Sequence, residues 1–209
     1  MRDIFDILKE ANAILKGHFV FTNGQHSDTY LNKDGLYPYA ELTSEVGMMM
    51  AEKTKDLDID TVVGPALGAI ILSQWTAYHL SKLKGKVIYG VYTEKMPDKS
   101  QRFTRGYDKF VKGKKVLVVE DWTTTGLSAL KTVKAIQEAG GDVVAVCSMV
   151  NRNPDEVTDE FFGTKYLPLK AIKIQACNED ECHMCKQGVP ISTEVGHGKE
   201  YLERKGIKQ

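Results

Sequence analysis

The sequence of 209 residues lacks an excess of charge of either sign, because its 28 Lys and Arg are balanced by 28 Asp and Glu. Non-specific binding to nucleic acids or to anionic membranes depends on a basic excess, so neutrality argues against both as the main activity. No apolar run reaches the roughly 18–20 residues that span a bilayer. Acids also interrupt the apolar residues of the first ten positions, unlike in a signal peptide. We therefore expect a soluble, cytoplasmic protein.

Cysteine is scarce as well. The chain has four, one at Cys147 and a C-terminal group at Cys177, Cys182 and Cys185. A framework of disulfides is typical of small secreted domains, which this chain does not resemble. The C-terminal group contains a Cys-x2-Cys pair, and with His183 or His197 as a fourth ligand it could bind a structural zinc ion. Free thiols and a disulfide remain open alternatives.

A nucleotide P-loop is also missing, since no Gly-x4-Gly-Lys-Ser/Thr follows any predicted strand. Instead, short β-branched runs alternate with amphipathic stretches from residue 61 onward. The pattern predicts strands over 61–63, 87–91, 116–119 and 143–150, and helices over 69–83 and 127–139. Strands that are apolar throughout indicate a parallel sheet with helices on both faces, so the fold class is α/β.

The remaining segments look like additions to this core. Apolar spacing predicts a helix over residues 2–15 that Gly17 ends, and a second helix over 38–55. Asn23-Gly24 predicts a turn that joins strands at 19–21 and 29–31 into a hairpin. We expect one domain over residues 1–209, with its core at about 40–165 and a small hood formed by 1–40 and 165–209.

The segment from Val116 to Ala129 carries the densest group of polar side chains. A buried strand leads to Glu120 and Asp121, and a Thr-rich loop then leads into a helix. In open parallel sheets ligands bind at the carboxyl ends of the strands, and hydroxyls and N–H groups at a helix N-terminus suit a phosphate. The two carboxylates suit vicinal sugar hydroxyls or a cation. Helix capping alone needs one hydroxyl, whereas this segment has four. The sequence therefore predicts a site for a ribose phosphate.

The pattern Glu-Asp-x-Thr-Thr-Thr-Gly-x-Ser after an aliphatic strand resembles the 5-phosphoribosyl 1-pyrophosphate (PRPP) signature of the type I phosphoribosyltransferases. The resemblance implies that family's parallel-sheet fold, a homodimer and a Mg²⁺ ion that accompanies PRPP. It also implies that Glu120 and Asp121 hold the ribose hydroxyls. The 5′-phosphate would be held by Thr123, Thr124, Thr125, Gly126, Leu127 and Ser128. Pyrophosphate would be held by a Gly-rich loop after the first strand of the core, at Ala66, Leu67 and Gly68.

The N-terminal region narrows the choice of base that the protein accepts. Residues 16–32 resemble the start of orotate phosphoribosyltransferases, which implies that Lys16 and Tyr30 lie on the base side of the site. Leu31 is assigned to the same side of the site, at a position where many relatives have a second aromatic residue. Arg152 matches an arginine that those enzymes use against the substrate, and a bidentate guanidinium suits a carboxylate. Thr124 is also assigned to the base. The resemblance thus implies transfer of the phosphoribosyl group to orotate.

A segment rich in Lys and Arg is the last part of the predicted site. Residues 82–115 hold eleven Lys and Arg against three acids. The stretch between Val91 and Val116 is too long for a simple connection. The resemblance implies a moving loop that closes over pyrophosphate, with Lys95, Lys99 and Arg102 catalytic together with Asp121. The loop lacks the histidine of orotate enzymes, so a purine base or a non-catalytic PRPP-sensing regulator remain alternatives.

Overall fold

The computed structural model describes residues 2–21, 23–173 and 175–206, and the chain divides into two compact units. The core unit contains Met1–Ile7 and Tyr37–Ile172, and the hairpin unit contains Leu8–Leu36 and Lys173–Gln209. The division lies near the predicted one between core and hood, with residues 1–7 and 165–172 grouped in the core unit. No described helix combines the length and the apolar character that a membrane span needs.

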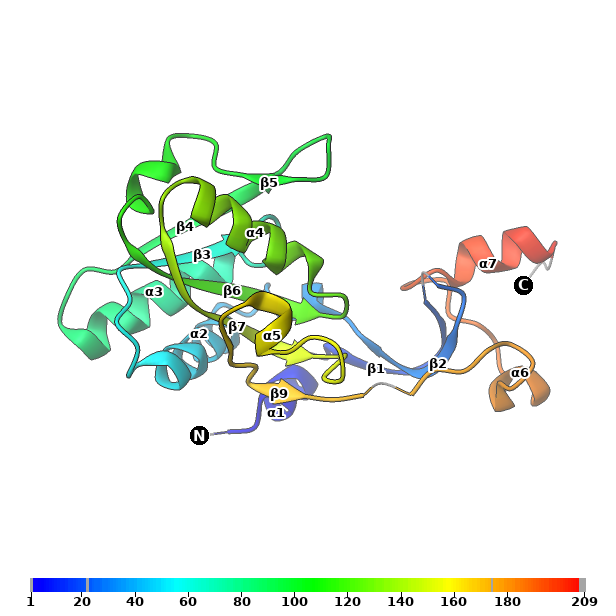
Figure 1. The fold of residues 1–209 in the computed structure, drawn as a ribbon. Coiled ribbons are helices and arrows are strands. Elements are labelled where there is room, and N and C mark those ends of the chain that lie inside the picture. The colour runs from blue at the N-terminus through cyan, green and yellow to red at the C-terminus, as the bar shows by residue number, and fades with distance from the viewer. Residues whose placement is uncertain (1, 22, 174, 207–209) are drawn as a thin grey trace. The chain divides into compact units, whose positions relative to one another are not determined.

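The core unit is built on one sheet with the strand order β5-β4-β3-β6-β7-β8, and β9 pairs with β7 (Figure 1). All of these pairings are parallel except the one between β4 and β5. The strands are β3 Thr61–Pro65, β4 Tyr89–Lys95, β5 Gln101–Arg102, β6 Lys115–Thr123, β7 Asp142–Asn151, β8 Lys165–Tyr166 and β9 Lys170–Ala171. The central strands β3 and β6 are almost wholly buried, as their β-branched composition predicts.

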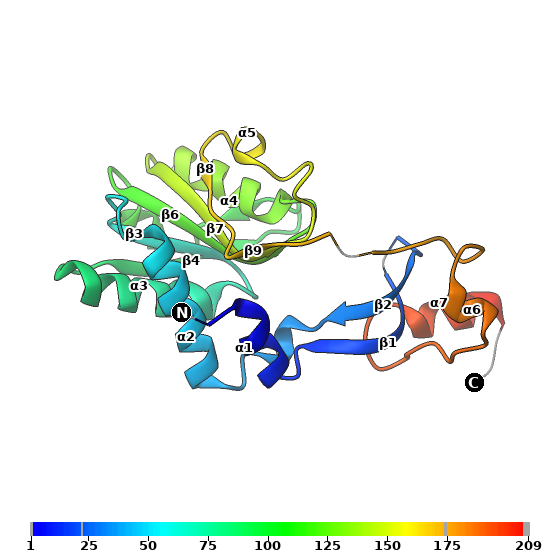
Figure 2. The same cartoon turned by 90° about the horizontal axis from the view of Figure 1, so that it is seen from below.

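Helices cover both faces of this sheet, which confirms the predicted α/β class. Helices α2 (Ala40–Thr54) and α3 (Ile70–Lys84) pack together on one face, and α4 (Leu127–Glu138) lies on the other (Figures 1 and 2). The short helix α5 spans Asp159–Phe162. The close approach of α2 to α3 needs Gly47, since a Cβ there would lie 2.5 Å from the Cβ of Trp75.

The predicted helix over residues 2–15 is wrong beyond its first half. Helix α1 spans only Ile4–Glu10. Asn12 has a positive φ of 50°, and the N–H of Ala13 donates to the carbonyl of Leu8, so the chain turns out of the helix before Leu15. Gly17 does not end a helix but lies in a strand. The apolar spacing of residues 11–15 therefore belongs to strand packing.

The hairpin unit begins with the antiparallel strands β1 (Ile14–Val20) and β2 (His26–Leu31), which confirms a hairpin in this region. A short 3₁₀ helix spans Lys33–Gly35, and the C-terminal segment forms α6 (His183–Lys186) and α7 (Gly198–Lys205). Isolated bridges join His18 to Ile191 and His26 to Cys177, so both ends of the chain build this unit. One of its apolar clusters joins β1 to the C-terminal segment and consists of Val20, Ile191, Tyr201 and Leu202.

Candidate functional site

The two predicted acids lie at the carboxyl end of the central strand β6. The strand runs through Thr123, so Glu120 and Asp121 belong to it rather than follow it. Both are buried, at 5% and 4% exposure. An oxygen of Asp121 accepts the N–H of Trp122 at 2.6 Å, and Glu120 accepts the N–H of Asp121 at 3.1 Å. These backbone contacts fix the direction of both carboxylates.

One partner of the acids was not predicted from the sequence. The hydroxyl of Tyr37 lies 3.5 Å from Oδ2 of Asp121. Tyr37 precedes α2 and is distant from β6 in the chain, so only the fold brings the two together. No local pattern around Tyr37 indicates this contact.

The loop after the acids leads directly into the N-terminus of α4. Thr124, Thr125 and Ser128 are exposed, and Gly126 is the residue that caps the helix. Because glycine has no side chain to accept hydrogen bonds, the first N–H groups of this twelve-residue helix remain open to a ligand. A pocket of about 210 Å³ lies here. It is lined by Glu120, Trp122, Thr123, Thr124, Thr125, Gly126, Leu127 and Ser128. Together these features make an anion site beside two carboxylates.

Gly126 is required by the shape of this loop. Its φ is +67°, and an added Cβ would lie 2.6 Å from Cε1 of Phe161. We expect Gly126→Ala to lower the free energy of unfolding by more than the roughly 1–2 kcal/mol of a left-handed residue alone, measured by denaturant unfolding. Gly113→Ala is the matched control, because Gly113 has a φ of +69° and no atom within 4 Å of the added Cβ. Equal losses in both variants would contradict a role for the Phe161 contact.

Thr123 differs from the rest of the predicted phosphate loop. It is 1% exposed, and its hydroxyl lies 2.5 Å from the hydroxyl of Tyr166 and 3.3 Å from Oδ1 of Asn151. The hydroxyl ties β6 to its neighbours, while Thr123 still lines the pocket, and its part in holding the phosphate stays a prediction. The sequence could not distinguish it from Thr124 and Thr125 because strand β6 extends further than predicted.

Two other predicted segments lie at the carboxyl ends of neighbouring strands. Arg152 directly follows β7, and its N–H donates to the carbonyl of Thr123 at 2.8 Å. The loop of Ala66, Leu67 and Gly68 follows β3, where a Cβ on Gly64 would lie 2.3 Å from the carbonyl oxygen of Ala69. Leu67 is 84% exposed. Strands β3, β6 and β7 are parallel neighbours, so these segments share one edge of the sheet.

The basic segment contains regular secondary structure and is not a single loop. Strand β4 continues to Lys95 and pairs with β5 as an antiparallel ribbon, and a 3₁₀ helix follows at Tyr107–Phe110. Arg102 is held by Asp98, with a nitrogen–oxygen distance of 3.1 Å. Lys95 and Lys99 are exposed and have no ion pair among the residues that the structure describes. Of the three predicted cationic side chains, these two lysines can bind an anion without first breaking an ion pair with a carboxylate.

Three of the five residues predicted to bind the base lie in the hairpin unit, whereas Thr124 and Arg152 lie in the core unit. Lys16 contacts Oδ2 of Asp28 at 3.1 Å and the hydroxyl of Thr29 at 2.6 Å. Tyr30 packs against Phe19, with 5.5 Å between ring centroids. Leu31 is 6% exposed, and its assignment to the base stays a prediction. The roles of Lys16 and Tyr30 stay predictions.

Two of the three C-terminal cysteines join a cluster with histidines, and the side chain of Cys177 forms a hydrogen bond with Cys182 beside it. Cys182 and Cys185 converge on His18 and His26 of the hairpin, whereas Cys177 is not part of that cluster. The two histidines that the sequence offered as a fourth zinc ligand are not part of this cluster. His183 is exposed at the start of α6, and His197 is 4.0 Å from Glu200.

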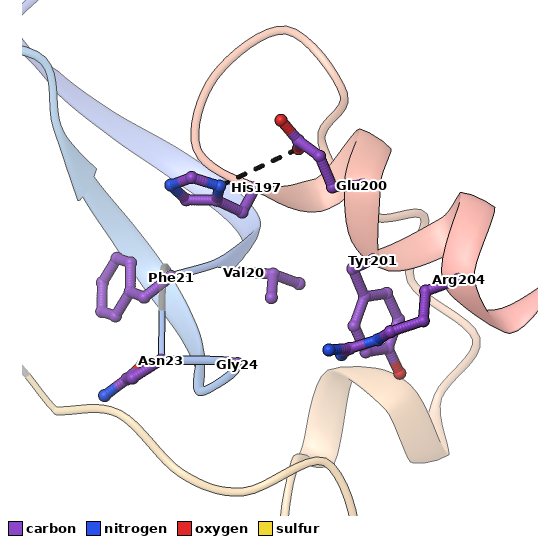
Figure 3. Close-up of a pocket in the computed structure, with 8 residues that line it drawn as sticks. All are labelled: Val20, Phe21, Asn23, Gly24, His197, Glu200, Tyr201 and Arg204. Atoms are coloured by element: carbon purple, nitrogen blue, oxygen red, sulfur yellow. Dashed lines mark ion pairs between the residues drawn. The ribbon is translucent and has the colours of Figure 1, made fainter.

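A second hollow of about 310 Å³ lies within the hairpin unit, between the hairpin turn and α7 (Figure 3). Its lining is Val20, Phe21, Asn23, Gly24, His197, Glu200, Tyr201 and Arg204. Figure 3 shows the ion pair of His197 with Glu200 at its rim. This lining contains no pair of adjacent buried carboxylates, so the pocket at α4 remains the candidate site.

Comparisons with known proteins identify relatives of this arrangement. A family model described as "Phosphoribosyl transferase domain" matches residues 37–177. An orotate phosphoribosyltransferase of Caldanaerobacter subterraneus subsp. tengcongensis is 33% identical over 188 residues, which cover 90% of this chain and 93% of that protein.

Crystal structures of the orotate phosphoribosyltransferase of Mycobacterium tuberculosis are similar in fold. The complex with Fe(III) dicitrate has a TM-score of 0.66 and 26% identity, covering 82% of this chain and 97% of that one. The complex with PRPP has a TM-score of 0.60 and 25% identity, covering 81% of this chain and 89% of that one.

Proposed function

This chain belongs to the phosphoribosyltransferase family, and we propose that it transfers the 5-phosphoribosyl group of PRPP to orotate, giving orotidine 5′-phosphate and pyrophosphate. The observation that carries the proposal is the similarity to an orotate phosphoribosyltransferase along 90% of the chain. The pocket at α4 supplies chemistry that PRPP needs, because it combines an anion site with the carboxylate of Glu120, which Asp121 follows directly on β6.

The 5′-phosphate binds the open N–H groups at the start of α4, assisted by the hydroxyls of Thr124 and Thr125. Glu120 and Asp121 accept hydrogen bonds from the ribose 2′- and 3′-hydroxyls. Both acids are buried, so their charges act in surroundings of low dielectric constant. As the bond to pyrophosphate breaks, positive charge develops on the ribose ring, and the nearby carboxylates stabilise it.

The leaving pyrophosphate gathers negative charge in the same step. The backbone N–H groups of Leu67 and Gly68 have no protein acceptor among the described residues, so they can bind this anion. Lys95 and Lys99 add mobile positive charge from the ribbon. The protein needs no covalent nucleophile, because the base nitrogen attacks C1 while these groups stabilise the departing anion. Arg152, beside Thr123, is positioned to bind the orotate carboxylate.

The residues present fit a Mg²⁺ ion that enters with PRPP. Carboxylate oxygens are ligands that Mg²⁺ prefers, and Glu120 with Asp121 offers them at the pocket. When bound, the ion neutralises phosphate charge and so helps pyrophosphate to leave. The fixed directions of both carboxylates suit this role without rearrangement of β6.

The reaction is tested by measuring pyrophosphate release from PRPP and Mg²⁺ with orotate, uracil, adenine, guanine, hypoxanthine or no base. We expect release with orotate. Release with a purine alone would identify a purine transferase and overturn the choice of base. PRPP binding without release for any base would identify a regulator on the same fold.

We also propose a homodimer that works in the cytoplasm. Support comes from apolar side chains that remain exposed on α3, with Ile71 at 40% and Tyr78 at 51% exposure. They lie seven residues apart and therefore on one face of the helix. A contiguous exposed apolar face is typical of a protein interface.

Tyr78→Glu is expected to give half the wild-type mass by light scattering, because a charge at the centre of an apolar interface is costly to bury. Gln137→Glu adds the same charge at an exposed position of α4, on the other face of the sheet, and should leave the mass unchanged. A monomeric wild-type protein, or a dimeric Tyr78 variant, would contradict this interface.

A further inference from the structure

Two cysteines and two histidines converge within the hairpin unit. His18 lies on β1, His26 begins β2, and Cys182 and Cys185 flank the first turn of α6. One candidate ligand atom from each residue lies within 4.8 Å of all the others. His26 and Cys182 are fully buried, and His18 is 2% exposed. Burying so many polar groups together is costly unless they share a partner.

Three nitrogen–sulfur distances in this cluster match those of a tetrahedral metal site. Nε2 of His18 lies 3.6 Å from Sγ of Cys182 and 3.7 Å from Sγ of Cys185, and Nδ1 of His26 lies 3.4 Å from Sγ of Cys185. Zinc bonds of about 2.0–2.1 Å to nitrogen and about 2.3 Å to sulfur place neighbouring N and S ligands about 3.6 Å apart in a tetrahedron. The two ring nitrogens are closer, at 2.8 Å.

The protonation of His18 is suited to a metal ligand. Its Nδ1 lies 2.8 Å from the carbonyl oxygen of Val189 and must carry the hydrogen, since a carbonyl can only accept. Nε2 therefore presents a lone pair to the cluster. Metal-binding histidines commonly donate their other N–H to a backbone carbonyl in this way.

A hydrogen bond between the two rings explains the cluster less well. With Nε2 of His18 as acceptor, Nδ1 of His26 must be the donor. Nε2 of His26 has no hydrogen-bond partner among the described residues in this arrangement or with a metal on Nδ1, so it does not distinguish the two. The hydrogen-bonded arrangement, however, gives the two thiols no role. A cation at the centre uses all four inward-facing atoms at once.

We propose that His18, His26, Cys182 and Cys185 bind one structural zinc ion. Two sulfur and two nitrogen ligands in a closed tetrahedral set are typical of zinc. The ion would join β1 and β2 to α6, whose cysteines lie more than 150 positions later in the chain. Units below about 70–80 residues commonly need a metal or disulfide to supplement a small core. The hairpin unit is within this size range, so it fits this pattern.

The first test measures zinc by mass spectrometry in the full chain, purified without chelator from zinc-supplemented cells. We expect one zinc per chain in the wild type, and its loss in Cys185→Ser and in His26→Ala. Cys177→Ser is the matched control and should retain zinc. Cys177 forms two backbone hydrogen bonds with His26, yet its sulfur is outside the cluster. A zinc-free wild type, a disulfide between Cys182 and Cys185, or equal loss in the control would overturn the proposal.

A second test needs no variant and stays decisive if the ligand variants fail to fold. The wild-type chain is stripped with a chelator and titrated with Co²⁺. We expect visible d–d bands of tetrahedral cobalt together with thiolate-to-cobalt charge transfer, saturating at one equivalent and displaced by Zn²⁺. Cobalt bands without charge transfer would overturn thiolate ligation. Neither test depends on transferase activity, so failure of the zinc site and failure of the proposed function are distinguishable.

Discussion

Replacing Lys99 with alanine is expected to lower kcat about 10²–10³-fold with little change in KM for PRPP, the loss typical of removing one group that stabilises a developing anion. Lys99 lies at the turn of the β4–β5 ribbon, is exposed and has no ion pair among the described residues. Its charge is therefore available to pyrophosphate as the bond to C1 breaks. Steady-state kinetics with PRPP and orotate measure both constants.

We expect the backbone conformation of the turn to be unchanged by this substitution. The N–H of Lys99 donates to the carbonyl of Met96 at 2.9 Å, and its own carbonyl accepts the side chain of Lys131 at 2.7 Å. These contacts use only the backbone of Lys99. Lys112→Ala removes the same charge from the same basic segment before β6, and should leave kcat unchanged. Normal turnover in both Lys99→Ala and Lys95→Ala would refute the assignment of the ribbon to pyrophosphate.

Asp121→Asn is expected to lower kcat/KM for PRPP about 10²-fold, because a hydrogen bond to a charged group contributes about 1.5–3 kcal/mol. Asparagine has nearly the same shape, and its Oδ1 can still accept the N–H of Trp122 that Asp121 holds at 2.6 Å. The substitution therefore removes the charge without removing the contact that orients the side chain. Kinetics at varied PRPP, with binding measured by calorimetry, would show the loss.

Asp142→Asn provides the control for this change. Asp142 is an exposed carboxylate at the opposite end of the same pair of strands, where β7 begins. It should tolerate the loss of charge with unchanged kinetics. An Asp121 variant with wild-type kcat/KM would show that the acid pair does not contact the ribose.

Much of the fold follows from local sequence. The aliphatic run at Val116–Val119 and the alternation of strands and helices predict a parallel sheet covered on both faces. The motif after this run also predicts that Glu120 and Asp121 come directly before the Thr-rich loop that leads into α4. Strand ends were harder to place, because hydrogen bonding to β7 extends β6 through Thr123. That extension buries the hydroxyl of Thr123, which no local pattern indicates.

What the sequence by itself determined is the chemistry of contiguous segments. The acid pair and the Thr-rich loop are contiguous, so their residue types predict a ribose-phosphate site, whereas the role of the basic segment follows from the family resemblance. The tertiary structure decided everything that joins distant positions. It brings Tyr37 to Asp121, and it assembles His18 and His26 with Cys182 and Cys185 while excluding Cys177. The reason is physical: sequence periodicity reports which face of an element is buried, whereas contacts between elements depend on how the whole chain packs.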